Sequence, residues 1–160
     1  MYTSDFAAGD LQPEQKSVYF SWLSALQDGI FPSLTAFGLP STQTALDVLS
    51  IYEIERCKAG AATDFKALYA RTRNSDTLRN KYVGTRLSEH AGFGPGSMMW
   101  GCFCEMAENP RPLLVSLPYV GALPGYHCTS EIYLPLLGEQ GRADYVLVGV
   151  VLLSAQHCDQ

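Results

Sequence analysis

The sequence is poor in charge, and in positive charge above all. It holds 11 lysine and arginine residues against 16 aspartate and glutamate residues, for a formal net charge of −5, and only 17% of its residues are charged. Its longest basic cluster is Arg71-Thr72-Arg73. A surface that neutralises nucleic-acid phosphates needs a denser basic patch than this. We therefore expect no nucleic-acid partner.

Long hydrophobic runs are also missing. The longest apolar run, from Tyr145 to Leu153, falls well short of the roughly 20 residues that a membrane-spanning helix requires. The first residues, Met1-Tyr2-Thr3-Ser4-Asp5, lack the basic and apolar regions of a signal peptide. We expect a cytoplasmic protein without a membrane partner.

A regular cysteine framework is absent too. The cysteines are odd in number, and their spacing matches no disulfide scaffold. They are Cys57, Cys102, Cys104, Cys128 and Cys158. Because thiols inside cells stay reduced, we expect no structural disulfide.

The apolar content, by contrast, is high. Hydrophobic residues make up 47% of the 160, which is enough for one sizeable core and argues against disorder. The small and polar residues near the start predict a flexible leader over residues 1–12. We expect one domain over residues 13–160.

An N-terminal helix is predicted over residues 13–28. Pro13 suits its first turn, and Asp28-Gly29 ends it. Its apolar residues recur at i, i+3, i+4 and i+7, and they are Tyr19, Trp22, Leu23 and Leu26. This stripe packs on the domain, and its unusual width also makes it the candidate interface of a homodimer.

The rest of the chain alternates between strand signals and short helices. Strands are predicted over residues 50–57, 65–71, 113–117, 129–137 and 144–154, with helix as the alternative for 65–71. A helical turn over 86–90 and a helix over 98–108 lie between them, and residues 138–141 join the last two strands as a hairpin. The pattern indicates an α+β fold: a five-stranded antiparallel sheet with short helices on one flank.

Three stretches, in their order and spacing, resemble the alphaproteobacterial PAS-like family of small signalling regulators. They are Trp22 with Gly29-Ile30-Phe31-Pro32-Ser33, Lys81-Tyr82-Val83-Gly84-Thr85-Arg86-Leu87 with Gly92-Phe93-Gly94, and Glu131-Ile132-Tyr133-Leu134-Pro135-Leu136 with Gly141-Arg142-Ala143-Asp144. The resemblance implies a PAS-type sensory or adaptor domain in bacterial signal transduction. Such a domain binds an unidentified small molecule, a protein signalling partner, or both. The resemblance implies no defined set of catalytic residues, so we expect that the protein is not an enzyme.

A soft aromatic patch marks the candidate ligand site. Met98, Trp100 and Phe103 lie on the helix predicted over 98–108, and they suit either core packing or the apolar wall of a pocket. In PAS folds the helical middle section lies across the sheet and forms that pocket. Its polar contacts would then come from Arg86, Tyr126, His127 and Tyr133, with Arg86 suited to a carboxylate.

Cysteine and histidine chemistry gives the alternatives. Cys102 and Cys104 have one residue between them, and His127 and Cys128 are adjacent. These spacings do not match structural zinc sites, so buried thiols are favoured over a metal site. A small cysteine-dependent enzyme would need a thiolate beside an orienting group, which the sequence does not offer. His90 and His127 could ligate haem iron, so a haem-binding sensor of the same fold is a further alternative. A structural interaction protein with a filled core is the remaining alternative.

Overall fold

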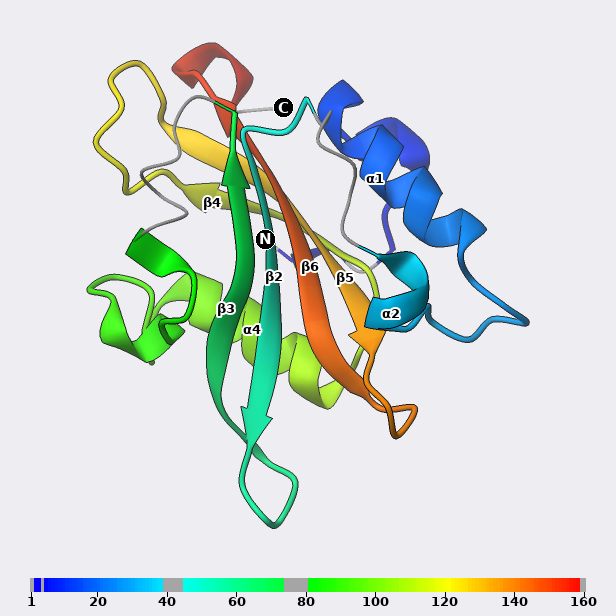
Figure 1. Ribbon diagram of the computed structural model, residues 1–160. Helices are drawn as coiled ribbons and strands as arrows, with labels where there is room; N and C mark the ends of the chain where they lie inside the picture. The colour runs from blue at the N-terminus through cyan, green and yellow to red at the C-terminus, as the bar shows by residue number, and fades with distance from the viewer. Residues whose placement is uncertain (1, 4, 39–44, 74–80, 159–160) are drawn as a thin grey trace.

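Five long antiparallel strands dominate the computed structural model, which describes residues 2–3, 5–38, 45–73 and 81–158. They are β2 (Val48–Arg56), β3 (Ala62–Thr72), β4 (Leu113–Pro118), β5 (Cys128–Leu137) and β6 (Ala143–Leu153). Their order across the sheet is β4-β5-β6-β2-β3, and the two-residue β1 (Tyr2–Thr3) adds to the β4 edge (Figure 1). The predicted α+β fold with its antiparallel sheet is confirmed, and residues 65–71 are strand, not helix.

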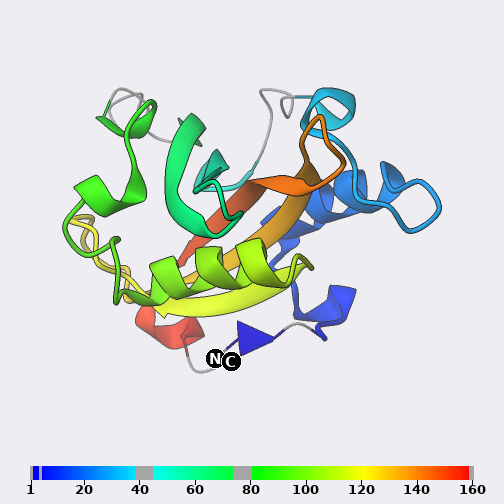
Figure 2. The same cartoon turned by 90° about the horizontal axis from the view of Figure 1, so that it is seen from below.

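Helices cover both faces of this sheet. The α-helices are α1 (Pro13–Ser24), α2 (Leu34–Phe37) and α4 (Met98–Glu108), and the 3-10 turns are η1 (Ala8–Asp10), η2 (Leu87–Glu89) and η3 (Ala155–His157). Figures 1 and 2 show α4 running across one face, with α1 packed on the opposite face. Helix α4 has the predicted bounds: the Ser97 hydroxyl caps its start by accepting from the Trp100 amide at 3.0 Å, and Pro110 follows its end.

The core is therefore split into two clusters by the sheet. The α4-side cluster is centred on Tyr52, Phe65, Phe103, Met106 and Tyr133. The α1-side cluster is centred on Trp22, Leu49, Ile51, Ile132 and Leu134. Because side chains alternate along a strand, odd residues of β5 face α4 and even ones face α1. Strands β5 and β6 are accordingly buried along most of their length.

Helix α1 is anchored to the sheet by two buried polar side chains. Trp22 is 2% exposed, and its Nε1 donates to the Pro135 carbonyl at 2.9 Å. The Gln15 amide donates to the Ser130 carbonyl at 3.0 Å. The helix ends at Ser24, before the predicted residue 28, because Asp28 (φ 52°) and Gly29 (φ 77°) form a tight turn that pairs Gln27 with Ile30.

Trp22 packs on the domain as predicted, but it does not have the second predicted role of an interface residue. Its indole is enclosed by the core of its own chain, so it offers no surface to a second copy. Tyr19, Leu23 and Leu26 are half-buried and pack against the same cluster. Phe20, which is 47% exposed, is the aromatic residue that α1 presents outward. The homodimer stays a prediction, without Trp22 as its centre.

The leader also differs from its prediction. Tyr2 and Thr3 pair with Val115 and Leu114 of β4. Leu11 is 3% exposed within the α1-side cluster, and Phe6 packs against Tyr19 with ring centroids 5.4 Å apart. The described residues before α1 are thus tied to the domain, because a few apolar side chains among the polar ones find places in its core.

The expectation of no disulfide is wrong, because Cys128 and Cys158 are bonded. The β5–β6 hairpin brings Leu153 opposite Cys128, and the turn η3 then carries Cys158 back towards the sheet. The two cysteines are 30 residues apart in sequence, and the proximity that the hairpin creates cannot be seen in cysteine spacing. The other three cysteines are not disulfide-bonded.

The anchoring role of Trp22 gives a first prediction. We expect Trp22→Ala to lower the free energy of unfolding by about 3–5 kcal/mol, because it removes a buried ring and leaves the Pro135 carbonyl without its donor. Phe20→Ala on the same helix is the control and should cost less than about 0.5 kcal/mol. Urea denaturation followed by circular dichroism measures both, and equal losses would contradict the assignment.

Candidate functional site

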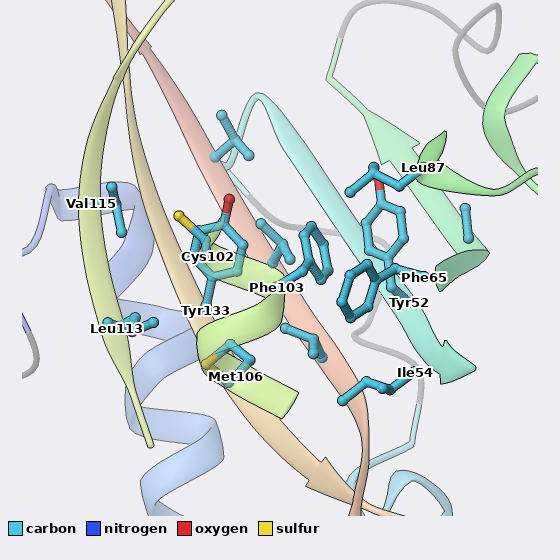
Figure 3. Close-up of a cluster of buried hydrophobic side chains, with 14 of the residues drawn as sticks. Tyr52, Ile54, Phe65, Leu87, Cys102, Phe103, Met106, Leu113, Val115 and Tyr133 are labelled. Carbon is cyan, nitrogen blue, oxygen red and sulfur yellow. The ribbon is translucent and has the colours of Figure 1, made fainter. Parts of the chain in front are cut away.

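Phe103 occupies the centre of the region where the sequence predicted a ligand pocket. Its side chain is fully buried, and its ring centroid lies 4.7 Å from Tyr52, 4.9 Å from Phe65 and 5.5 Å from Tyr133 (Figure 3). The contacts with Tyr52 and Tyr133 are edge-to-face, which is a favoured packing of aromatic rings, and the Phe65 ring is tilted at 35°. The aromatic patch is therefore packed as core between α4 and the sheet.

A carboxyl group lies inside this apolar interface. Glu131 of β5 faces α4, and it is 7% exposed. Its Oε1 accepts a hydrogen bond from the Thr129 hydroxyl at 2.7 Å, and its Oε2 accepts one from the Tyr133 hydroxyl at 2.6 Å. The residues beside it on the neighbouring strands are Val115 and Val150. No ion pair formed by the described residues involves Glu131.

The Tyr133 hydroxyl links this carboxyl to helix α4. Besides donating to Glu131, it lies against the Cys102 thiol, as Figure 3 shows. Cys102 is fully buried on the inner side of α4. Thr129, Glu131, Tyr133 and Cys102 thus form one polar chain from the sheet to the helix, which we call the Glu131 network.

Burial controls the electrostatics of the network. It raises the pKa of Glu131, and the hydrogen bonds from Tyr133 and Thr129 oppose this only in part. Burial also raises the pKa of Tyr133 well above its ordinary value, with the Glu131 charge adding to the effect. For Tyr52, burial is again the first cause, and it raises the pKa to about 12. Each group therefore favours its neutral form.

The network can exist in two hydrogen-bonding arrangements. A protonated Glu131 has one O–H to donate, whereas an ionised Glu131 can only accept. Ionisation places a charge in an apolar interface with two neutral donors, which is costly without a cation. Tyr133 contacts both the carboxyl and Cys102, so it connects Glu131 to α4.

Two more predicted ligand residues lie on α4 but at its outer side or edge. Met98 is the first residue of the helix and is 47% exposed. Trp100 is half-buried, with its ring edge-on to Phe65 at 5.1 Å. Of the predicted apolar contacts, Phe103 alone therefore approaches the centre, where Tyr133 meets it.

The remaining predicted polar contacts lie outside the α4–sheet interface. Tyr126 and His127 belong to the connection between β4 and β5, where Tyr126 is half-buried with its ring 5.9 Å from that of Tyr119 and His127 is exposed. They precede β5, so its pleat does not direct them towards α4. Strand alternation predicts that Tyr133 faces the α4–sheet interface. It predicts no direction for Tyr126 and His127, which lie outside the strand.

Arg86 is engaged elsewhere. Its guanidinium donates to both carboxylate oxygens of Glu55, at 2.6 and 3.0 Å, and a further oxygen of Glu89 lies 3.6 Å away. Glu55 follows Ile54, whose side chain is buried in the α4-side cluster, so Glu55 and Arg86 lie on the other face. The predicted contact between Arg86 and a ligand beneath α4 is not what the structure has.

An open depression of about 540 Å³ with strongly charged walls lies beside this pair at the end of β2, and Arg56 and Asp144 also line it. Its arginines are paired within the chain. Arg142 Nε lies 2.7 Å from an Asp144 oxygen, and Arg56 Nε lies 3.7 Å from the same atom. Arg56 also donates to the carbonyls of Gly60, Ala107 and Ala143. These contacts join the ends of the β2–β3 and β5–β6 hairpins to each other and to the last turn of α4.

The cysteine and histidine alternatives find little support in the geometry. Cys102 points to Tyr133, whereas Cys128 is bonded to Cys158. His90 Nε2 lies 2.6 Å from the Thr85 hydroxyl, which itself donates to the Tyr82 carbonyl. Within residues 2–3, 5–38, 45–73 and 81–158, no three metal-ligating side chains of the His, Cys, Asp or Glu type come together.

Glu131 is the functional candidate that motif reasoning missed. The signal was available, because Glu131 is the one charged residue in the segment 128–137. It also shares a strand face with Tyr133, two residues away. A lone charge inside an apolar strand indicates either a surface-facing position or a buried ionisable group, and burial on both faces leaves the second.

Comparison of the chain with protein-family models, with curated proteins and with solved structures finds no match in any of the three. Within the described ranges, none of the helices has the length and apolar character needed to cross a lipid bilayer.

The buried carboxyl predicts a specific pH dependence. Below its ordinary pKa of 4.5, Glu131 is protonated in both the folded and the unfolded chain. As pH rises from there to the higher folded pKa, only the unfolded chain releases the proton, so stability falls by up to roughly 1.4 kcal/mol per pH unit. We therefore expect wild type to lose stability relative to Glu131→Gln as pH rises.

Chemical denaturation of both proteins across this pH window measures the difference. Glu139→Gln removes an exposed carboxylate from the β5–β6 turn and is the matched control, which should follow wild type. A difference between wild type and Glu131→Gln that stays constant with pH would contradict the assignment.

Proposed function

We propose that this chain is a PAS-type sensory or adaptor domain in bacterial signal transduction, and that the α4–sheet interface around the Glu131 network is its responsive part. Numbered along the chain from β2 to β6, the five long strands are ordered 2-1-5-4-3 from one edge. This is the strand order of a PAS sheet, and α4 lies across it where PAS domains carry their helical section. The support is an analogy of fold.

The observation that carries the proposal is the Glu131 carboxyl beneath α4. A leucine at this position would pack without any desolvation cost, whereas a buried carboxyl with only neutral hydroxyl partners lowers stability. Buried ionisable groups with shifted pKa values concentrate at functional sites. A contribution to stability therefore does not explain why a glutamate occupies position 131. A role in switching between two states does explain it.

A signal would act by shifting α4 between two arrangements on the sheet. Because Phe103 occupies the centre, a small molecule entering beneath α4 must displace its ring. The ligand then favours the arrangement with the ring displaced in proportion to its differential affinity for the two. A protein partner bound to the outer side of α4 would bias the same equilibrium.

The alternatives have weaker support. A cysteine-dependent enzyme needs an accessible thiolate beside an orienting side chain. Cys102 is buried, and burial raises the pKa of Cys104. Cys57 is exposed with a lowered pKa, but backbone hydrogen bonds of the β2–β3 turn lower it, not an orienting side chain. A haem sensor needs a histidine inside the core, yet His127 is exposed and His90 Nε2 is hydrogen-bonded to Thr85. The cysteines and histidines therefore support thiol catalysis and haem binding less well than the Glu131 network supports a sensory role.

Hydrogen exchange tests whether α4 responds to the carboxyl. After correction for intrinsic rates, amides of α4 should lose protection between about pH 5 and about pH 8 in wild type, because ionisation of Glu131 weakens its hold on Tyr133 and α4. Glu131→Gln should show no such loss, and Glu139→Gln should match wild type. Equal protection of α4 at both pH values in wild type would contradict the proposal.

Native mass spectrometry of the purified wild-type protein then separates the two modes of signalling. A co-purified small molecule that is lost in Phe103→Trp, which enlarges the ring at the centre, indicates a ligand sensor. Protein of unmodified mass, combined with a pH-responsive α4, indicates an adaptor that signals through a protein partner.

A further inference from the structure

The disulfide joins two parts of the molecule that few other contacts hold together. Cys128 is the first residue of β5, and Cys158 directly follows η3, with Cα atoms 5.9 Å apart. Between them the backbone amide of His127 donates to the Leu153 carbonyl at 2.9 Å. Beyond Leu153, the residues of η3 are exposed. The covalent bond is thus the main tie between the segment 154–158 and the sheet.

The two cysteines differ in exposure. Cys128 is buried at 7% exposed, whereas Cys158 is half-buried and follows the exposed residues of η3. An external thiolate therefore reaches the Cys158 sulfur first, and Cys128 is the leaving group. This asymmetry is what a reversible exchange site requires, since one sulfur must be open to attack while the other stays in place.

We propose that Cys128 and Cys158 form a reversible thiol–disulfide clasp whose reaction partners are low-molecular-weight thiols and disulfides. Its oxidised form holds the segment 154–158 against the start of β5, and its reduced form releases that segment. The proposal stands independently of the PAS-type function, because it rests on the placement of these two residues alone.

The exchange balances without any further reagent. A thiolate RS⁻ attacks Cys158 Sγ, forms an RS–S bond there, and expels the Cys128 thiolate, which takes up a proton. A second RS⁻ attacks the sulfur of the R group, giving RSSR and the Cys158 thiolate, which is protonated in turn. Overall, the protein disulfide and two RSH become the dithiol and RSSR, and the oxidation runs in reverse.

The clasp is also placed to influence the Glu131 network. Thr129, which follows Cys128, donates to Glu131 and has the Leu117 carbonyl 3.4 Å from its hydroxyl. Reduction loosens the beginning of β5, where Thr129 lies. We expect release of the segment 154–158 to be accompanied by faster exchange at residues 127–129.

Alkylation with iodoacetamide under denaturing conditions counts the thiols at defined ratios of reduced to oxidised glutathione. Native wild-type protein equilibrated in these buffers and then acid-quenched should carry three modified cysteines at the oxidising end and five at the reducing end. Five modified cysteines at every ratio would overturn the clasp. Three at every ratio would overturn its reversibility.

Hydrogen exchange on the intact protein tests the structural consequence. Segment 154–158 should exchange several-fold faster in the reduced protein than in the oxidised one. Cys158→Ser should match the reduced protein, while Cys57→Ser, which alters an exposed thiol in the β2–β3 turn, should match wild type. Equal exchange in oxidised and reduced wild type would overturn the proposal even if the thiol count changes.

Discussion

The burial of β5 on both faces is the constraint on which the rest of the structure depends. Successive side chains of this strand enter different cores, so Ile132 and Leu134 contact α1 while Glu131 and Tyr133 face α4. One residue of slip would exchange these environments and place Glu131 against the Trp22 cluster. The register is fixed from the α1 side, because Gln15 binds the Ser130 carbonyl and Trp22 binds the Pro135 carbonyl. The helix that looked like an interface therefore sets the position of the carboxyl beneath the other helix.

Much of the architecture was predictable because it rests on local signals. Alternating apolar residues bounded by Gly138 and Gly141 indicated the β5–β6 hairpin, and Ser97 and Pro110 set the ends of α4. The aromatic contacts of Phe103 and the inward direction of Tyr133 follow from the same patterns. Residues 65–71 were ambiguous by propensity, and pairing with β2 on one side decides for strand.

The predictions that differ from the structure share a physical cause. Contacts between residues far apart in the sequence cannot be read from the spacing of those residues along the chain. Cys128 and Cys158 meet only because a hairpin returns the chain. Arg86 was expected at a ligand, yet it meets Glu55, which lies 31 residues away in sequence. Trp22 was expected at a surface, yet its stripe is wide because α1 sits over two strands. The absence of a disulfide was inferred from an intracellular location, and the Cys128–Cys158 bond contradicts that inference.

Glu131 connects these observations to function. A carboxyl in this interface makes the stability of the fold depend on its proton, and each pH unit between the unfolded and folded pKa values changes that balance by roughly 1.4 kcal/mol. Shifts of one to three kcal/mol are the size of coupling found between sites in switching proteins. Full unfolding requires more than this, whereas the proposed function needs only a local shift of α4, which is held by its apolar face and by contacts of Arg56 and Arg111 at its C-terminal end. In the proposed function a buried acid next to α4 biases a local equilibrium, whereas the same acid in the α1-side core, where the register is set, would only weaken the fold.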